Sequence, residues 1–392
     1  MLTRCCIVAS ALLLAGCGGS SLASHPPLQT MGGASALPGG GASALPGGGA
    51  SALPGDEILA CGNAVATGSA DCTVVVNSAI AAIAQAQTPA DMLPGLHPEQ
   101  LQNAYALSPQ NGGGTVAIVV AYDNPAAESD LAVYRNAYGL PPCTSVNGCF
   151  QKLNQQGEAA SYPVSDVTWS VESSLDLDMV SAVCPNCKID LVEANSNSLD
   201  DLGAAVDAAA RSGAIAISNS YYAAEWSGES TEDSHYNHPG IAITVSAGDA
   251  AQPFYPAASP YVTAVGGTSL TGGTGAWSES AWAYTGQGCS LYEIKPDWQG
   301  NNYCQGKRSA VDVAAIADPK TGVSMYDSTA GGWLVAGGTS VGAPIVAAAY
   351  ALSGNPQGPA YSYAHRSAFH DVAPAGYDWP TGLGSPSGVG GL

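Results

Sequence analysis

Basic residues are scarce in this chain of 392 residues. Ten Lys and Arg stand against 31 Asp and Glu, which gives a formal net charge of −21 at pH 7. A nucleic-acid partner requires a basic face, and ten cations over this length do not supply one. The apolar fraction of 46% is ordinary for a folded protein, so general disorder is not expected either. The composition predicts an acidic globular protein that binds no nucleic acid.

The N-terminal apolar run is too short to span a membrane. It covers residues 5–14 after Arg4, whereas a bilayer requires about 20 residues. The run leads into Leu14-Ala15-Gly16-Cys17, which resembles the lipobox of bacterial lipoproteins. We therefore expect a signal peptide over residues 1–16 and an acylated Cys17 that anchors the exported protein at the cell envelope, on the outer membrane or the cell surface. An ordinary secretory signal with a chance cysteine, and later release from the membrane, stay open.

Three identical copies of Gly-Gly-Ala-Ser-Ala-Leu-Pro-Gly follow, over residues 32–55. A period of eight residues is too short for a solenoid repeat, and one Leu per copy cannot build a core. Residues 17–60 are therefore predicted to be a flexible tether, with a ligand-binding repeat as the alternative. A short segment, 61–95, connects the tether to a domain predicted over 96–392.

The cysteines indicate an oxidising location. Of eleven Cys, two leave with the signal peptide and one is the predicted lipid site, so eight remain. The simplest proposal pairs sequence neighbours in structural disulfides. A redox or zinc motif is the alternative for the CxxC stretch at 184–187, but no second CxxC and no close His completes a metal set. The expected pairs are Cys61–Cys72, Cys143–Cys149, Cys184–Cys187 and Cys289–Cys304.

Strand-like and helix-like segments alternate along the domain. Residues 115–121 form a near-continuous apolar run typical of a buried strand, and 200–211 begin with two Asp and end before a Gly, as a helix does. Alternation of this kind predicts an α/β fold, a doubly wound and mostly parallel sheet with helices on both faces. The other expected strands are 188–193, 214–218 and 241–245, and the other expected helices are 125–138, 171–183 and 340–353.

Ser340 stands at the start of the last of these helices, after a Gly pair. A serine there places its hydroxyl near backbone N–H groups that can stabilise a developing oxyanion. An N-cap serine with no chemical role is the alternative interpretation.

A serine nucleophile needs a base, and none of the six His has a suitable setting. Glu172 and Asp176, four residues apart, are instead expected on one face of a helix. Like charges at this spacing destabilise a helix, so the pair indicates a functional role. A solvated acidic face is the competing interpretation. A third acid, Asp249, follows a predicted strand.

Several segments in this order resemble the sedolisins, serine-carboxyl peptidases with a subtilisin-like fold. The resemblance runs from about Leu96 to the C-terminus. Its members are Asn103-Ala104-Tyr105, the strand 115–122, the stretch from Tyr138 to Cys143, the stretch from Val245 to Asp249, the run 255–268, the stretch from Asp312 to Pro319 and the stretch from Gly337 to Pro344.

The resemblance implies a role for each acid. Ser340 matches the family nucleophile, Glu172 the general base, Asp176 the acid that orients Glu172, and Asp249 the oxyanion-hole acid. A Glu base and a neutral Asp donor both favour acidic pH. We expect an acid-acting, monomeric serine-type peptidase that hydrolyses proteins or peptides, as an endopeptidase or a tripeptidyl-peptidase. A catalytically inactive surface lipoprotein with a binding role, or an adhesive protein acting through its repeats, are the alternatives.

The resemblance also implies a Ca²⁺ site near the C-terminus. Asp371 and Asp378 would give carboxylates, and Val372 and Gly376 backbone oxygens, which are hard ligands suited to Ca²⁺. The loop between the two halves, residues 373–375, is shorter than in the family. Sedolisins also carry a long prodomain, so segment 61–95 is expected to be either a remnant of one or a linker.

Overall fold

The computed structural model describes residues 57–59, 61, 67–77, 89–108, 113–273, 275–300, 303–354, 356–372 and 376–392. The predicted signal peptide, Cys17 and the repeats over 32–55 lie outside the described residues. The described residues fall in one structural unit, Ala42–Leu392. Within them, no helix combines the length and the apolarity that crossing a bilayer requires.

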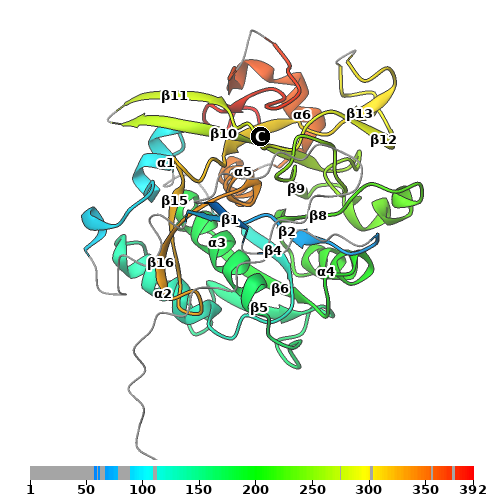
Figure 1. Cartoon of the computed structure of the whole chain (residues 1–392). Coiled ribbons are helices and arrows are strands. Elements are labelled where there is room, and N and C mark those ends of the chain that lie inside the picture. The colour runs from blue at the N-terminus through cyan, green and yellow to red at the C-terminus, as the bar shows by residue number, and fades with distance from the viewer. Residues whose placement is uncertain are drawn as a thin grey trace, which may run out of the picture. The chain divides into compact units, whose positions relative to one another are not determined.

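The centre of this unit is an eight-stranded, mostly parallel sheet (Figure 1). Its strands run in the order β11-β10-β9-β7-β4-β6-β5, with β14 paired to β10 as well. Every pairing in it is parallel except that of β10 with β11. The strands are β4 (Thr115–Ala121), β5 (Phe150–Asn154), β6 (Lys188–Ala194), β7 (Ala216–Asn219), β9 (Ala242–Ser246), β10 (Thr263–Gly273), β11 (Ala276–Ala281) and β14 (Val313–Ile316).

Burial explains why the central strand β4 is almost wholly apolar. Residues 116–121 of β4 are at most 1% exposed, so both faces of this strand are covered. Helices α3 (Val167–Val183) and α5 (Thr339–Ser353) pack against each other and against the sheet, while α4 (Leu199–Arg211) packs on β4 and β6. The predicted α/β sheet with its covering helices is confirmed. The remaining helices are α1 (Pro98–Ala104), α2 (Ala127–Ala137) and α6 (Pro359–Ala364).

Capping residues move some helix boundaries from their predicted positions. Helix α3 begins four residues before the expected 171, because Asp166 accepts hydrogen bonds from the backbone N–H groups of Thr168 (2.9 Å) and Trp169 (3.1 Å). Helix α4 begins at Leu199, since the Ser198 side chain accepts a hydrogen bond from the Asp201 N–H. Side-chain hydrogen bonds set these helix boundaries, and the periodicity of apolar residues in the sequence gives no information about them.

The segment before the domain takes part in its strand pairing. A four-stranded sheet has the order β1-β3-β16-β15, and the short strand β2 (Asp71–Cys72) pairs with β8 (Tyr221–Tyr222). The sheet joins β1 (Glu57–Leu59) and β3 (Val75–Asn77) to β15 (Val323–Asp327) and β16 (Gly332–Gly337). Residues 71–72 and 75–77, placed by sequence in the connecting segment, therefore pair directly with strands of the domain, and residues 57–59 pair with 75–77. Two further pairs are β12 (Cys289–Ile294) with β13 (Lys307–Ser309) and β17 (Phe369–His370) with β18 (Ser385–Pro386).

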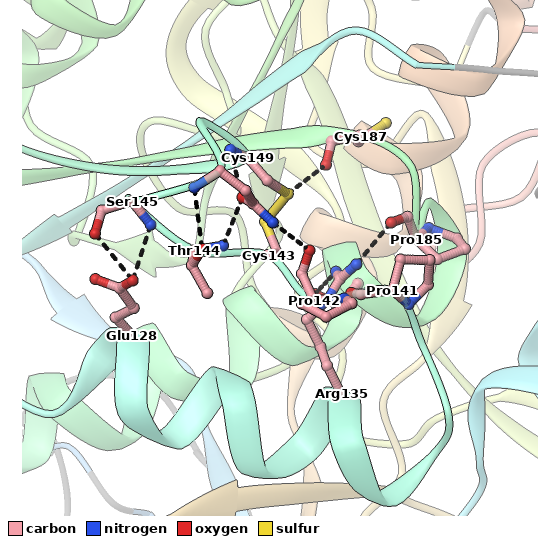
Figure 2. Close-up of a disulfide and its surroundings, with 12 residues drawn as sticks. Glu128, Arg135, Pro141, Pro142, Cys143, Thr144, Ser145, Cys149, Pro185 and Cys187 are labelled. Atoms are coloured by element: carbon pink, nitrogen blue, oxygen red, sulfur yellow. Dashed lines mark hydrogen bonds between the residues drawn. A yellow bond between two sulfur atoms is a disulfide. The ribbon is translucent and has the colours of Figure 1, made fainter.

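All four expected cysteine pairs are disulfides in the structure. Figure 2 shows the Cys143–Cys149 bridge beside the buried Arg135, whose guanidinium donates to the carbonyl oxygens of Pro141 (2.6 Å) and Pro185 (2.7 Å). Pro185 lies inside the CxxC stretch, so the same arginine connects this stretch to the segment just before Cys143. The structure pairs Cys184 with Cys187, in line with the structural interpretation of this motif rather than with zinc.

Candidate active site

Glu172 and Asp176 lie on α3 and are both 0% exposed. The interpretation of this pair as a solvated acidic face is therefore wrong. Glu172 Oε2 accepts a hydrogen bond from the Thr73 N–H (3.0 Å), and Asp176 Oδ1 accepts one from the Ser220 hydroxyl (2.7 Å). The other oxygen of each carboxyl group is buried without a hydrogen-bond partner. Two shielded oxygens of this kind are the atoms available to hold or exchange a proton.

Burial sets the electrostatics of this pair. It raises the pKa of Glu172 well above its ordinary value, and the neighbouring charge of Asp176 raises this pKa further, while a hydrogen bond from the Ser340 hydroxyl lowers it. Burial likewise raises the pKa of Asp176, against the hydrogen bond from Ser220. Two carboxyl groups that repel each other in an apolar site do not ionise together, so the pair keeps one proton over a wide pH range.

Ser340 is the second residue of α5 and is also 0% exposed. The N-cap is Gly338, with a φ of 91°, so the interpretation of Ser340 as a capping residue is wrong. A residue with a side chain is strained at this φ, which is why a glycine precedes the serine by two positions. The Ser340 hydroxyl is therefore free of a structural capping role, and it lies close enough to Glu172 to lower the pKa of that residue, as a nucleophile beside its base does.

Asp249 follows β9 and turns its carboxyl group toward the start of α5. Its Oδ1 accepts hydrogen bonds from the backbone N–H (2.9 Å) and the hydroxyl (2.8 Å) of Thr339, while its Oδ2 is shielded from solvent without a partner. Burial raises the pKa of Asp249 to about 7, although both Thr339 bonds lower it. Below this pH the group is a neutral acid with a proton to donate from Oδ2.

The structure thus brings all four sequence-predicted residues to one place. The charges of Asp176 and Asp249 both raise the pKa of Glu172, and the neighbouring Ser340 hydroxyl lowers it. These side chains come from α3, from the loop after β9 and from the N-terminus of α5, as expected where the carboxyl ends of parallel strands meet. His235 and His238 contact Asp207 instead, with nitrogen–oxygen distances of 2.8 and 3.0 Å.

Two positioning residues escaped the sequence analysis. Ser220 follows β7 and hydrogen-bonds to Asp176, and Thr339 precedes the nucleophile and holds Asp249. The position of Ser220 at the carboxyl end of a predicted strand is the signal that points to it. Thr339 gives no such signal, because a threonine at a helix start is common for capping alone.

Comparison with known proteins agrees with this geometry. No family model matches the chain. Over 172 aligned residues it is 34% identical to kumamolisin from Bacillus sp. (strain MN-32), and over 168 it is 35% identical to sedolisin from Pseudomonas sp. (strain 101). These matches cover 34% and 33% of this chain and 31% and 28% of the relatives, so they span about a third of the length of those proteins.

A solved structure extends the match over most of the domain. Pseudomonas sedolisin, a serine-carboxyl proteinase complexed with two molecules of pseudo-iodotyrostatin, superposes with a TM-score of 0.66 and 25% identity. The match covers 76% of this chain and 96% of that structure. These matches support the assignment of the chain to the sedolisin family. The S41 psychrophilic protease shares the fold alone, with 16% identity over 73% of this chain and 96% of its own, and a TM-score of 0.51.

The calcium residues implied by the sedolisin resemblance lie near one another. Asp371 Oδ2 accepts a hydrogen bond from the Gly376 N–H (2.6 Å), and Asp378 accepts from the N–H and hydroxyl of Thr381 (2.9 and 2.8 Å to Oδ1). Burial raises the pKa of Asp378, and the charge of Asp371 raises it further. Carboxylate oxygens are ligands that suit Ca²⁺, so the chemistry of Asp371 and Asp378 fits this ion. Residues 373–375, between the two halves, lie outside the described part of the chain.

Proposed function

We propose that this domain is a serine-type peptidase that hydrolyses protein or peptide substrates in acid. The observation that carries the proposal is the convergence of Ser340, the buried Glu172–Asp176 pair and an Asp249 oxygen with no partner. Its similarity to sedolisins supports the same reaction.

Each residue has a distinct task in this reaction. Glu172 accepts the Ser340 proton through Oε1, since Oε2 already accepts from Thr73. Asp176 holds the shared proton of the pair and is itself oriented by Ser220. Asp249 donates a hydrogen bond from Oδ2 to the oxyanion, because Thr339 fixes its other oxygen and leaves this one free. The proton on Glu172 then passes to the leaving amine, and water completes the cycle.

The expected activity at acidic pH follows from Asp249, the oxyanion donor. Asp249 can donate only while it is protonated, and its pKa of about 7 keeps it neutral through the acidic range. Because burial raises the pKa of Glu172 and of Asp176, loss of the first proton of the pair limits the activity on the acidic side. We therefore expect activity to decline as the pH rises through about 7.

The test is hydrolysis of denatured casein at about pH 4 by the full chain and by Ser340→Ala. Loss of the nucleophile should lower the rate by at least about 10³-fold. Glu172→Gln should lose nearly as much, because an amide cannot take the proton. Matched exposed controls are Ser129→Ala and Glu99→Gln, which should keep the wild-type rate.

A rate maximum near pH 8, or hydrolysis that survives Ser340→Ala, would contradict this mechanism. A well-folded wild-type chain that cleaves nothing would favour the inactive binding protein instead. Whether the enzyme acts as an endopeptidase or a tripeptidyl-peptidase would follow from the masses of the peptides released.

We further propose that the enzyme is an exported monomer, anchored to the cell envelope by acylation of Cys17. The lipobox-like motif and the four disulfides support export. The Cys17→Ser variant should be absent from the membrane fraction or should remain as the unprocessed precursor. A variant of mature size that still fractionates with the membrane would disprove the lipid anchor. The Ca²⁺ proposed for Asp371, Val372, Gly376 and Asp378 would have a structural role and takes no part in the reaction steps.

A further inference from the structure

Strand β12 carries an exposed apolar surface. Of its six residues, Leu291, Tyr292 and Ile294 are 67, 40 and 74% exposed. We call these three side chains the hairpin face, because β12 pairs with β13 in a two-stranded hairpin at the periphery of the domain (Figure 1). Single apolar residues are common on protein surfaces, but three within four positions of one strand indicate an interaction site.

The hairpin is fixed by covalent and hydrogen bonds. The Cys289–Cys304 disulfide closes it. The backbone N–H groups of residues 291–293 donate to side-chain oxygens, the first to Glu225 (3.1 Å) and the next two to Ser290 (3.1 and 2.7 Å). A partner therefore meets apolar side chains here rather than a free strand edge. Because these side chains lie on a fixed strand, little conformational freedom is lost when a partner binds.

The one acidic residue of β12 brings no charge to this face in acid. Glu293 is 4% exposed, and burial raises its pKa to about 7. Asp233 and Glu225 raise this pKa further, and Lys307 opposes them. Glu293 is therefore neutral over the acidic range in which the peptidase is proposed to act, so the hairpin face then has no charge beneath it.

The hairpin begins beside the loop that carries Asp249. The Gly286 N–H donates to the Gly248 carbonyl oxygen (2.6 Å), so the chain just before β12 lies along this loop. Leu291 is five residues beyond Gly286, which corresponds to at most about 18 Å of chain. A substrate polypeptide that extends about five residues from the oxyanion donor covers the same distance. A long substrate in the active site can therefore contact the hairpin face as well.

From this placement we infer that the hairpin face is a docking surface for apolar side chains of an unfolded protein substrate. The inference rests on the proposed peptidase activity. Continuity with the Asp249 loop favours a substrate over a second copy of this chain or a lipid surface. Contacts made far from the scissile bond are equally strong before and in the transition state, so they lower KM for long substrates and leave kcat unchanged.

The experiment compares denatured casein with a hexapeptide at about pH 4, for the full chain and for the double variant Leu291→Ser/Ile294→Ser. A hexapeptide cut at its centre extends only about 10 Å to either side of the scissile bond, whereas casein extends much further. In the double variant the KM of casein should rise about tenfold with kcat unchanged, because two apolar contacts are lost. The KM and kcat of the hexapeptide should stay within about twofold of wild type.

Val146→Ser is the matched control, because Val146 is 96% exposed within another disulfide loop, Cys143–Cys149. It should leave the KM of both substrates unchanged. The conservative double variant Leu291→Met/Ile294→Val should keep the wild-type KM of casein, since it preserves the apolar contact. The melting temperature of each variant should match wild type, because the substituted side chains are exposed.

A binding measurement tests the surface without catalysis. Labelled casein titrated with the Ser340→Ala chain should show a higher Kd when the two serine substitutions are added. An unchanged Kd, or an equal rise in KM for casein and hexapeptide, overturns the docking surface. If wild type cleaves neither substrate while the Kd rises as expected, the proposed peptidase is wrong and the apolar binding surface stands.

Two further measurements test the other occupants. Light scattering should find a wild-type monomer, and the unacylated Cys17→Ser chain should not sediment with vesicles of phosphatidylethanolamine and phosphatidylglycerol. A dimer that the double variant converts to a monomer would assign the hairpin face to a second copy of this chain. Sedimentation with vesicles that the serine substitutions abolish would assign it to lipid. Either result, with an unchanged KM for casein, overturns the substrate proposal.

Discussion

Asp249 is the residue at which hydrogen bonding and charge decide the chemistry most directly. Its two oxygens are unequal, because Thr339 donates twice to Oδ1 and nothing in the described residues donates to Oδ2. An amide in the same place satisfies both requirements. Its oxygen accepts the two Thr339 bonds, and its NH₂ group donates where the protonated Oδ2 would.

Asp249→Asn should therefore keep part of the rate, and Asp249→Ala should lose on the order of 10²–10³-fold in kcat. The pKa of Asp249 is raised to about 7, so wild-type activity should fall above this pH as the donor ionises. The Asn variant has no such ionisation, and its alkaline limb should be less steep. The measurement is kcat/KM on one peptide from pH 3 to 8.

Asp91→Asn, on an exposed side chain, is the matched control and should keep the wild-type profile. If the Asn and Ala variants lose the same factor in kcat, Asp249 acts through its negative charge and not as a hydrogen-bond donor.

At the scale of single elements, the C-terminal strands β17 and β18 carry the proposed calcium site. Asp371 follows β17 directly, and Asp378 pairs through its backbone with Gly382, shortly before β18. A cation bound to the folded state alone stabilises it by mass action. Chelation with EGTA at about pH 7 should therefore lower the melting temperature, and added Ca²⁺ should restore it.

Asp378→Asn should abolish this response, whereas Asp91→Asn should retain it. If neither the chelator nor added Ca²⁺ changes the melting temperature, and elemental analysis finds no metal, the calcium site is disproved.

Elements buried on all sides were the ones that the sequence predicted well. The apolar run of β4 matches its predicted bounds, and α5 begins one residue from its predicted start, because burial on both faces leaves few other patterns. The i, i+4 spacing likewise placed Glu172 and Asp176 on one face. The docking of residues 71–77 had no such signal. Their partners, Tyr221 and Gly337, are far away along the chain, and nothing local in the sequence reports a contact of that kind.

At the scale of the whole molecule, the folded domain holds protons that an unfolded chain would release. Burial raises the pKa of several carboxyl groups outside the active site, among them Glu193 to about 8, Glu229 to about 9 and Glu293 to about 7. Glu225 raises the pKa of Glu229 further, and Asp233 and Glu225 do so for Glu293. Nearby cations oppose these shifts only in part, Lys152 at Glu193 and Lys307 at Glu293. With ten Lys and Arg in the chain, few of its 31 acidic groups can have a cation as partner.

The sign of the pH dependence follows from these shifts. In the unfolded chain the same groups ionise near 3.8 for Asp and 4.5 for Glu, whereas in the folded domain they stay protonated to higher pH. Between those values the folded state binds more protons, so the free energy of unfolding falls as the pH rises. Self-repulsion within a chain of formal charge −21 acts in the same direction.

We therefore expect the melting temperature to be highest near pH 4 and to fall steadily up to about pH 9, where the last of these groups ionises. Glu229→Gln should flatten the curve, because an amide of the same shape has no proton to lose, and the exposed Glu99→Gln should leave it unchanged. Scanning calorimetry of the inactive Ser340→Ala chain measures this without self-digestion. A melting temperature that is equal or higher at pH 8 would mean that these carboxyl groups ionise in the folded protein as they do in water.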